Sequence, residues 1–324
     1  MKNVSSLGIL ILMLAGCAAG SEDKDPGDTP TRRVAEAPGA PALSPQTAEL
    51  VFMSNRDGNG EIYRWRPGDA EWKNLTDHPA GQNWPEISPD GTRIAFQDSR
   101  EGKLDIWVMG ADGSDPQRLT DHPEHDYLPA WTPDGLRITF TSWRTEPGDE
   151  EPAPHLYVMN ADGSEPRRLM AESLGTSAGA AWAPDGQSFV IARKVGSEAG
   201  DADSELYLAS AEGEVLRQLT DDDASNGAPA FSPDGAWIAF YTDRGETSML
   251  EVMRTDGSER RTVVTDGQSW YPRWSPDGRW LVYTAATTDM DLDLFVVPVD
   301  GSREPVRIVG SEARDGEGRW WPWR

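Results

Sequence analysis

The chain has 324 residues, of which 55 are acidic and 30 basic, and its formal net charge at pH 7 is −25. A surface this negative repels the phosphate backbone of nucleic acids and the headgroups of an anionic membrane, so we expect neither to be a binding partner. The chain contains 32 glycines, 25 prolines and 14 tryptophans. This composition, without long helical apolar stripes, is typical of many short strands joined by tight turns.

The first 17 residues have the layout of an export signal. A lysine precedes an apolar run over residues 4–14, which is too short to span a bilayer and has the length of a signal-peptide core. The run ends in Leu14-Ala15-Gly16-Cys17, which resembles the lipobox of bacterial lipoproteins, and Cys17 is the only cysteine. The resemblance implies cleavage of a signal peptide, residues 1–16, and lipid attachment at Cys17. An ordinary cleaved signal with an incidental cysteine is the alternative.

Residues 17–48 link this signal to the rest of the chain. They are rich in proline, alanine, glycine and charge and show no hydrophobic period, so we expect a flexible tether. In the sorting rule of the lipoprotein family, an aspartate after the cysteine favours the inner membrane, and Ala18 therefore favours the outer one. We expect an exported protein, anchored by lipid at the cell envelope on the outer membrane and facing the periplasm.

A Pro-Asp-Gly turn recurs five times in one context. Successive aspartates of these turns lie 44, 51, 49 and 43 positions apart. A period near 45 residues built from strands is the signature of β-propeller blades. The five copies are Ser88-Pro89-Asp90-Gly91, Thr132-Pro133-Asp134-Gly135, Ala183-Pro184-Asp185-Gly186, Ser232-Pro233-Asp234-Gly235 and Ser275-Pro276-Asp277-Gly278.

Each repeat predicts four strands. The first ends at the apolar residue just before the turn, and the third and fourth are joined by Asp-Gly hairpins such as Asp112-Gly113. In the repeat around Asp90 the second strand includes 93–96, the third 105–109 and the fourth 118–120. The predicted first strands end at Ile87, Trp131, Trp182, Phe231 and Trp274.

The two ends of the repeat region predict a sixth unit. Residues 49–76 begin at a second strand with no Pro-Asp-Gly before it, whereas the C-terminus has the pattern of a first strand, with Pro322 in the position of Pro85. Joining the two fragments would close the ring and leave no open sheet edge. The predicted fold is all-β: a six-bladed β-propeller of four-stranded blades over residues 49–324, closed by the C-terminal strand.

The repeat resembles that of TolB-type propellers over residues 49–324. The pattern runs Pro-x-Trp-Ser-Pro-Asp-Gly, an apolar strand, Ser-x-Arg, Ile-Tyr-Val-Met-x-x-Asp-Gly-Ser and Arg-Leu-Thr. The resemblance is specific for fold and weak for function, because the family includes envelope scaffolds, peptidase propeller domains and polysaccharide lyases. It implies a propeller that binds an envelope protein, such as a peptidoglycan-associated lipoprotein, through one end. The family's globular domain before the propeller is replaced here by the tether, which puts roles of that domain in doubt.

Catalytic and metal-binding patterns are weak. The segment 175–179 matches Gly-x-Ser-x-Gly, but that motif needs a later histidine, and the last histidine is His155. His78 and His122 occupy the same position in neighbouring repeats, too far apart for one metal, and we expect both to cap turns. The segment 57–61 is too short for a calcium loop of the EF-hand type, and calcium binding by loop carboxylates stays open. We expect no catalytic residue, no metal and no cofactor.

The residues just before each repeat proline are the best binding candidates. They enter the innermost strand beside the mouth of the channel, they vary from repeat to repeat, and several are aromatic. Structural packing is the alternative role for each of them. The candidates are Asn83, Trp84, Asp126, Tyr127, Asn226, Trp270, Tyr271, Trp320 and Trp321.

The sequence therefore predicts a lipid-anchored, non-catalytic, TolB-like propeller that acts as a monomeric protein-binding scaffold at the bacterial envelope. Binding of carbohydrate or peptidoglycan through mouth aromatics is the first alternative, and a lyase-type enzyme is the second. The rim of the channel discriminates between them. Exposed tryptophan rings would favour sugar stacking, a mixed acidic and apolar rim would favour protein, and convergent histidines would favour an enzyme.

Overall fold

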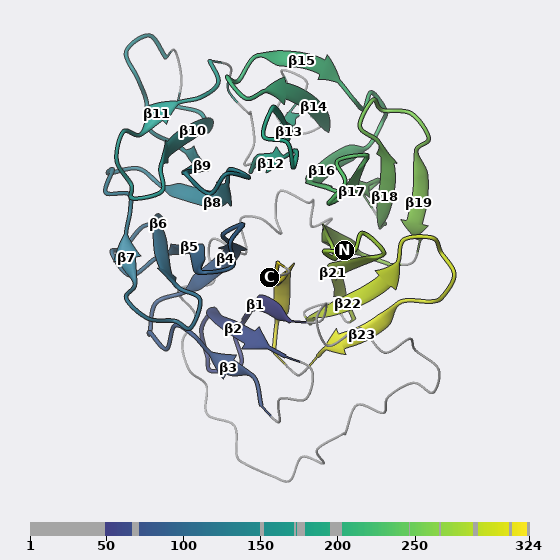
Figure 1. The fold of residues 1–324 in the computed structure, drawn as a ribbon, viewed down its shortest axis with the longest axis horizontal. Helices are drawn as coiled ribbons and strands as arrows, with labels where there is room; N and C mark the ends of the chain where they lie inside the picture. The colour runs from purple at the N-terminus through teal and green to yellow at the C-terminus, as the bar shows by residue number, and fades with distance from the viewer. Residues whose placement is uncertain are drawn as a thin grey trace.

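The computed structural model describes residues 49–322, apart from 67–70, 150–151, 172, 174–178, 195–202, 246, 266, 288–290 and 311–312. Cys17, the predicted signal and the tether lie outside the described residues. The described chain forms six four-stranded antiparallel sheets arranged as a ring (Figure 1). It contains no helix, and hence none long and apolar enough to cross a membrane. The predicted all-β, six-bladed propeller is confirmed.

The blades are numbered along the chain, with their strands given from the channel outwards. Blade 1 is β24 (Asp315–Trp320), β1 (Leu50–Ser54), β2 (Glu61–Trp65) and β3 (Lys73–Asn74). Blade 2 is β4 (Gln82–Ile87), β5 (Arg93–Asp98), β6 (Asp105–Gly110) and β7 (Gln117–Arg118). Blade 3 is β8 (Asp126–Trp131), β9 (Arg137–Ser142), β10 (His155–Asn160) and β11 (Arg167–Arg168).

The other three blades have the same order. Blade 4 is β12 (Ala181–Trp182), β13 (Ser188–Lys194), β14 (Ser204–Ser210) and β15 (Val215–Gln218). Blade 5 is β16 (Ser225–Phe231), β17 (Trp237–Asp243), β18 (Ser248–Arg254) and β19 (Arg261–Val264). Blade 6 is β20 (Ser269–Trp274), β21 (Trp280–Ala286), β22 (Leu292–Pro298) and β23 (Val306–Val309). The inner strands of blades 2–6 end at the five residues predicted.

The Pro-Asp-Gly turns use their aspartates to stabilise their own backbone. The Asp90 carboxylate accepts hydrogen bonds from Ser88 Oγ (2.6 Å) and from the main-chain N–H of Thr92 (3.1 Å). These hydrogen bonds, that of Ser88 foremost, lower the pKa of Asp90. Gly91 adopts a φ of 70°, which glycine reaches without strain. Part of the acidic excess at this end of the blades is therefore committed to turn formation.

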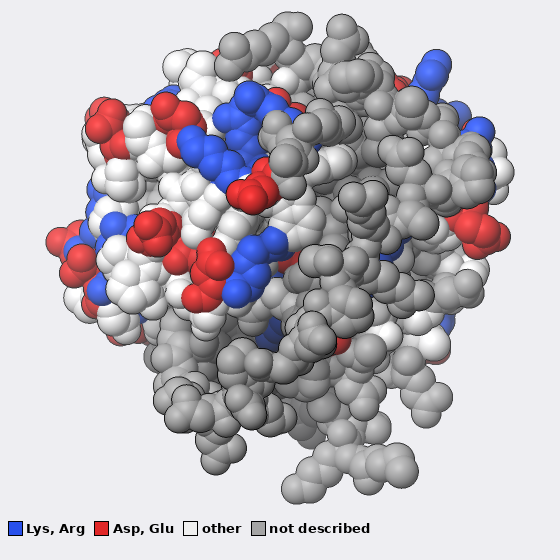
Figure 2. Space-filling view, turned by 90° about the horizontal axis from the view of Figure 1, so that it is seen from below, with Lys and Arg blue, Asp and Glu red and all other residues white. Residues whose placement is uncertain are grey.

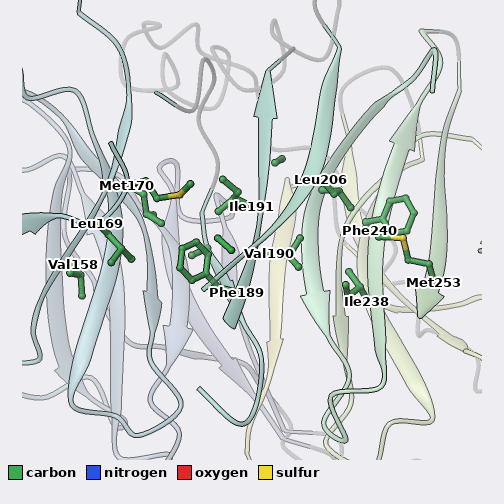
Figure 3. Close-up of a cluster of buried hydrophobic side chains, with 14 residues drawn as sticks. Val158, Leu169, Met170, Phe189, Val190, Ile191, Leu206, Ile238, Phe240 and Met253 are labelled. Atoms are coloured by element: carbon green, nitrogen blue, oxygen red, sulfur yellow. The ribbon is translucent and has the colours of Figure 1, made fainter. Parts of the chain in front are cut away.

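The hydrophobic core lies between the faces of neighbouring blades. Around blade 4, Phe189 and Val190, adjacent residues of β13 that face opposite sides of the sheet, are fully buried in a core that also includes Val158 of blade 3 and Phe240 of blade 5 (Figure 3). Each blade thus buries apolar side chains on both faces. A blade at the end of an open array would leave one of these faces in water, so closing the ring contributes directly to stability.

Several of the glycine-containing hairpins between strands three and four, such as Asp112-Gly113 and Glu212-Gly213, contact the preceding blade. A Cβ atom added to Gly213 would lie 2.1 Å from the carbonyl oxygen of Leu169, and one added to Gly113 would lie 2.5 Å from that of Leu75. Leu75 belongs to an Arg-Leu-Thr-type segment that follows a fourth strand, and Leu169 occupies the equivalent position in its own blade. Glycine is required at these turns both by its positive φ and by the backbone of the neighbouring blade.

We expect Gly213→Ala to destabilise the propeller more than Gly102→Ala. Both glycines have positive φ, 89° and 83°, but a Cβ at Gly102 meets nothing within 4 Å. The backbone strain of about 1–2 kcal/mol is therefore shared. The clash with Leu169 should add about 1–3 kcal/mol to the loss at Gly213. Urea unfolding of the two variants measures the difference, and equal losses would show that the two blades separate there without cost.

The C-terminal strand closes the ring, as predicted. β24 pairs with β1 through Leu50 opposite Trp320 and Met53 opposite Gly316, and the Trp321 N–H donates to the carbonyl oxygen of Glu49 (2.8 Å). Figure 1 shows β3, β7, β11, β15, β19 and β23 on the outer rim of the ring. The inner strand of blade 1 thus comes from the opposite end of the chain.

The predicted alignment of Pro322 with Pro85 is wrong. Each inner strand except β12 has a bulge whose first residue has positive φ: Trp84 at 54° in β4 and Glu317 at 59° in β24. Gly318 therefore takes the place of Pro85, and Pro322 corresponds to the proline of the following turn. The sequence Trp320-Trp321-Pro322-Trp323 imitates Trp270-Tyr271-Pro272-Arg273-Trp274, which explains the error of four residues.

Candidate functional site

The inner strands of all six blades line a cavity of about 730 Å³. A cavity of this volume is large enough for a small organic ligand or a short stretch of peptide. Its walls are uneven. Blades 3, 4 and 5 contribute Ala130, Ala181 and Ala230 at the position next to the last residue of the inner strand. Blades 2, 6 and 1 contribute charged side chains at the same position.

The charged side of the channel consists of Glu86, Arg273 and Arg319. The Nε and Nη2 atoms of Arg319 both contact Glu86 Oε1, at 2.7 and 2.6 Å. Arg273 Nη2 lies 3.8 Å from the same oxygen. Burial foremost, and then the positive charge of Arg319, lower the pKa of Arg273 to about 9. The single carboxylate of Glu86 therefore balances the charge of two guanidinium groups in a partly desolvated channel.

An aromatic cluster lies beside these charges in the channel. Trp84 and Tyr271 each precede a charged residue, Glu86 or Arg273, by two positions on the same inner strand. The rings of Trp84 and Tyr271 meet edge to face with centroids 4.8 Å apart, and the ring of Tyr241 lies 6.3 Å from that of Tyr271. Burial raises the pKa of Tyr241 to about 12 and raises that of Tyr271 further. Trp84 and Tyr271 come from blades 2 and 6, so their contact crosses in front of blade 1 and narrows the channel.

Four of the predicted mouth residues come together in this cluster. Trp84, Tyr127, Trp270 and Tyr271 belong to one group of buried apolar side chains contributed by several blades. Each is less than 9% exposed. They therefore form the wall of the ring at this end, and their rings are not presented as an open stacking surface.

Two of the three polar mouth candidates, Asp126 and Asn226, interact with neighbouring polar side chains. Asp126 is fully buried and forms an ion pair with Arg144, whose Nη2 donates to Asp126 Oδ2 at 2.7 Å. Asn226 donates to Asp222 Oδ1 and accepts from Thr242 Oγ1, both at 2.9 Å. Asn83 is half-buried on the bulge side of β4. The structure assigns the first two to positioning the inner strands.

Trp320 and Trp321 lie away from the mouth, contrary to the prediction. Trp320 packs in the core between blades 6 and 1, and Trp321 packs in the core between blades 1 and 2. The Trp320 Nε1–H donates to the carbonyl oxygen of Arg273 (3.2 Å), and the Arg64 guanidinium lies 4.6 Å from the centroid of Trp321. The error follows from the register of β24, which places both residues at the turn end of the strand.

Charged side chains that the sequence analysis missed surround one end of the cavity. They lie on blades 4 and 5, in the segments that join strands two and three or that precede an inner strand. Trp143, in the equivalent segment of blade 3, is 38% exposed and donates from Nε1 to Tyr127 Oη (2.9 Å). The only sequence signal was the Ser-x-Arg position that Arg244 shares. The charged rim residues are Lys194, Asp203, Asp223, Asp243 and Arg244.

The outer side of the ring carries both signs of charge. On the side shown in Figure 2, lysine and arginine side chains are interspersed with aspartate and glutamate side chains. The excess of negative charge is therefore not gathered into one acidic face there. This arrangement disfavours a purely electrostatic partner on that side and leaves the channel as the better-defined concave feature.

The catalytic and metal patterns find little support in the geometry. His78 Nδ1 accepts from the Ala80 N–H (3.1 Å) and His122 Nδ1 from the Glu124 N–H (3.2 Å), which confirms their predicted role as turn caps. In the described part of the chain, no three histidine, cysteine or acidic side chains gather closely enough to hold a metal ion. Most of the Gly-x-Ser-x-Gly segment lies outside the described residues.

Comparison with protein families identifies the fold family. The model described as the TolB beta propeller domain matches residues 153–322, more than half of the chain. The chain belongs to this family. A second model, the Tricorn protease N-terminal beta propeller domain, matches residues 66–198. Together the two matches span residues 66–322, which include all five Pro-Asp-Gly turns.

Individual relatives of this TolB-like propeller are distant. An uncharacterised protein of Agrobacterium fabrum is 29% identical over 126 residues, which span 37% of this chain and 41% of that protein. TolB from Acinetobacter baumannii superimposes with a TM-score of 0.70 at 19% identity, covering 85% of this chain and 66% of that one. An oligogalacturonate lyase in complex with manganese reaches 0.57 at 14% identity, over 82% of this chain and 75% of that one. These likenesses to solved structures establish the fold alone.

Proposed function

We propose that this TolB-like propeller is a lipid-anchored, non-catalytic scaffold that binds a protein partner at the bacterial cell envelope. Cys17 carries the lipid, residues 17–48 tether the ring, and the ring faces the periplasm from the outer membrane. The protein acts as a monomer without a cofactor. Its partner is an envelope protein, and a peptidoglycan-associated lipoprotein is one candidate.

The chemistry of the cavity rim supports a protein partner. Lys194, Asp223 and Arg244 place both signs of charge at the rim, close to the apolar wall of the channel. Protein interfaces combine such an apolar centre with a polar rim. Sugar stacking is less well supported, because the rings of Trp84 and Tyr271 pack against each other and are only 7% and 8% exposed.

To test this proposal, proteins are cross-linked in intact envelopes, and the partners are then purified together with the full-length chain. The double variant Asp223→Lys, Arg244→Glu reverses two exposed rim charges and should lower capture of the specific partner about tenfold or more, because like charges would then face each other. Capture is quantified by mass spectrometry. Labelling with radioactive fatty acid in the same cells reports on the anchor, which Cys17→Ser should abolish.

The matched control is Glu304→Lys. Glu304 is exposed in the hairpin segment between β22 and β23, at the opposite end of the blades from the rim. Its charge reversal should leave capture unchanged. Equal capture by the wild type and the double rim variant would refute binding at this rim. Retention of the label in Cys17→Ser would refute the anchor.

A further inference from the structure

One level of the channel differs in electrostatic character from the rest of the protein. The chain as a whole carries a formal charge of −25, yet at one level of the channel two arginines face a single glutamate. Glu317 lies nearby and has its pKa raised to about 7, mainly by burial, so it contributes less than a full negative charge near neutral pH. The low dielectric of the channel walls strengthens the resulting positive field for anything that enters.

Of the two arginines at this level, Arg273 has the less compensated charge. Among the described residues, its hydrogen bonds are donated by Nη1 to the carbonyl oxygens of Pro272 (2.9 Å) and Ala228 (3.5 Å). Its Nη2 is 3.8 Å from Glu86 Oε1, beyond hydrogen-bond length. That oxygen is already held by two nitrogens of Arg319. Arg273 thus keeps donors available towards a cavity that it lines.

The opposite wall leaves room for an occupant. Ala130, Ala181 and Ala230 stand at the level of Arg273, and the residues that follow the first two of them, Trp131 and Trp182, also line the cavity. Alanine at three of the six positions leaves open space where longer side chains would fill the channel.

We propose that Arg273, with Arg319 and Glu86 beside it, forms a binding site inside the channel for the carboxylate of a small organic acid. The planar guanidinium group matches a carboxylate in shape and can donate two parallel hydrogen bonds to it. The acid brings the negative charge that Glu86 supplies to Arg319 but not fully to Arg273. This site goes beyond the proposed scaffold function, since it needs no protein partner.

Two sources of such a carboxylate are distinguished by matched probes. Acetyl-glycyl-phenylalanine represents the free end of a peptide, and its C-terminal amide is the uncharged control. Galacturonate represents an acidic sugar, and galactose is its uncharged control. Titration of each into the full chain is followed by calorimetry and by tryptophan fluorescence. At least one acid should bind about tenfold or more tightly than its uncharged counterpart, the difference expected for hydrogen bonds between charged groups.

Two substitutions should shift the affinity of that acid in opposite directions. Arg273→Gln removes the charge while keeping a donor for the main-chain carbonyls, and should weaken binding about tenfold or more. Glu86→Gln removes the competing carboxylate and should strengthen it. Arg254→Gln is the control, because Arg254 lies on β18 and is partly exposed beside Glu259. A variant that had merely lost packing could not produce opposite shifts.

The proposal is overturned if neither acid binds better than its control, or if both substitutions weaken binding equally. Even if a variant folds poorly, the affinities of the wild type for each acid and for its uncharged control still test whether the channel binds a carboxylate. Acid binding that survives Asp223→Lys, Arg244→Glu, while partner capture is lost, would separate this site from the scaffold function. Partner capture without any acid binding would refute the site alone.

Discussion

Removal of residues 315–324 should lower the melting temperature of the propeller more than any single substitution, or prevent folding altogether. The deletion takes away β24, the whole inner strand of blade 1. It also removes Trp320 and Trp321, each 7% exposed, from the two cores that flank blade 1. Truncation of one buried tryptophan costs about 3–5 kcal/mol. The combined loss is comparable with the total stability of a typical domain, about 5–15 kcal/mol.

Thermal unfolding and hydrogen exchange of β1 measure this effect. The single variant Trp320→Ala keeps the strand and should lose about 3–5 kcal/mol. Deletion of residues 21–44, within the predicted tether, should leave the melting temperature unchanged and serves as the control. If the chain without 315–324 melts like the full chain, the ring does not depend on the pairing of β24 with β1.

The fold could be predicted because its signals are local and repeated. Asp90 and its counterparts in the other turns form hydrogen bonds with residues only a few positions away. The residues that stabilise each turn can therefore be recognised in a short stretch of sequence. The spacing of these turns predicted the size of a blade. The incomplete units at the two ends of the repeat region predicted that they combine into one blade and close the ring. The register of β24 was harder to predict from the sequence. In this strand Glu317-Gly318 takes the bulge position at which most other inner strands have a residue followed by proline, and Pro322, four positions later, was mistaken for that proline.

The candidate site depended on contacts that no local pattern encodes. Trp84 and Tyr271 are 187 residues apart in sequence, and only the curvature of the ring brings their rings together. The same holds for Glu86 and Arg319, which meet because the chain ends beside its own second blade. Burial could not be predicted for residues at a channel entrance either. A bulge with positive φ turns the side chain of Trp84 into a cluster shared by several blades.

We expect Glu317→Gln to stabilise the protein increasingly as the pH rises from about 4.5 to 7. Burial foremost raises the pKa of Glu317 to about 7, from an ordinary value of 4.5. Between these values the folded state holds a proton that the unfolded chain has released, so the stability of the wild type falls as the pH rises. At 1.36 kcal/mol for each pKa unit, the fall amounts to about 3 kcal/mol and is complete above the folded pKa.

Glutamine cannot ionise, so it is free of this loss, and its side-chain oxygen can still accept from the Trp84 N–H as Glu317 Oε2 does at 2.5 Å. Urea unfolding at pH 4.5, 6 and 8 should therefore show the variant gaining about 3 kcal/mol on the wild type across the range. Acids with lowered pKa, such as Asp90, act in the opposite direction but cancel in the comparison. The exposed Glu304→Gln should show no such trend. A constant difference between Glu317→Gln and the wild type at all three pH values would mean that Glu317 is ionised throughout, with its charge satisfied by the arginines of the channel.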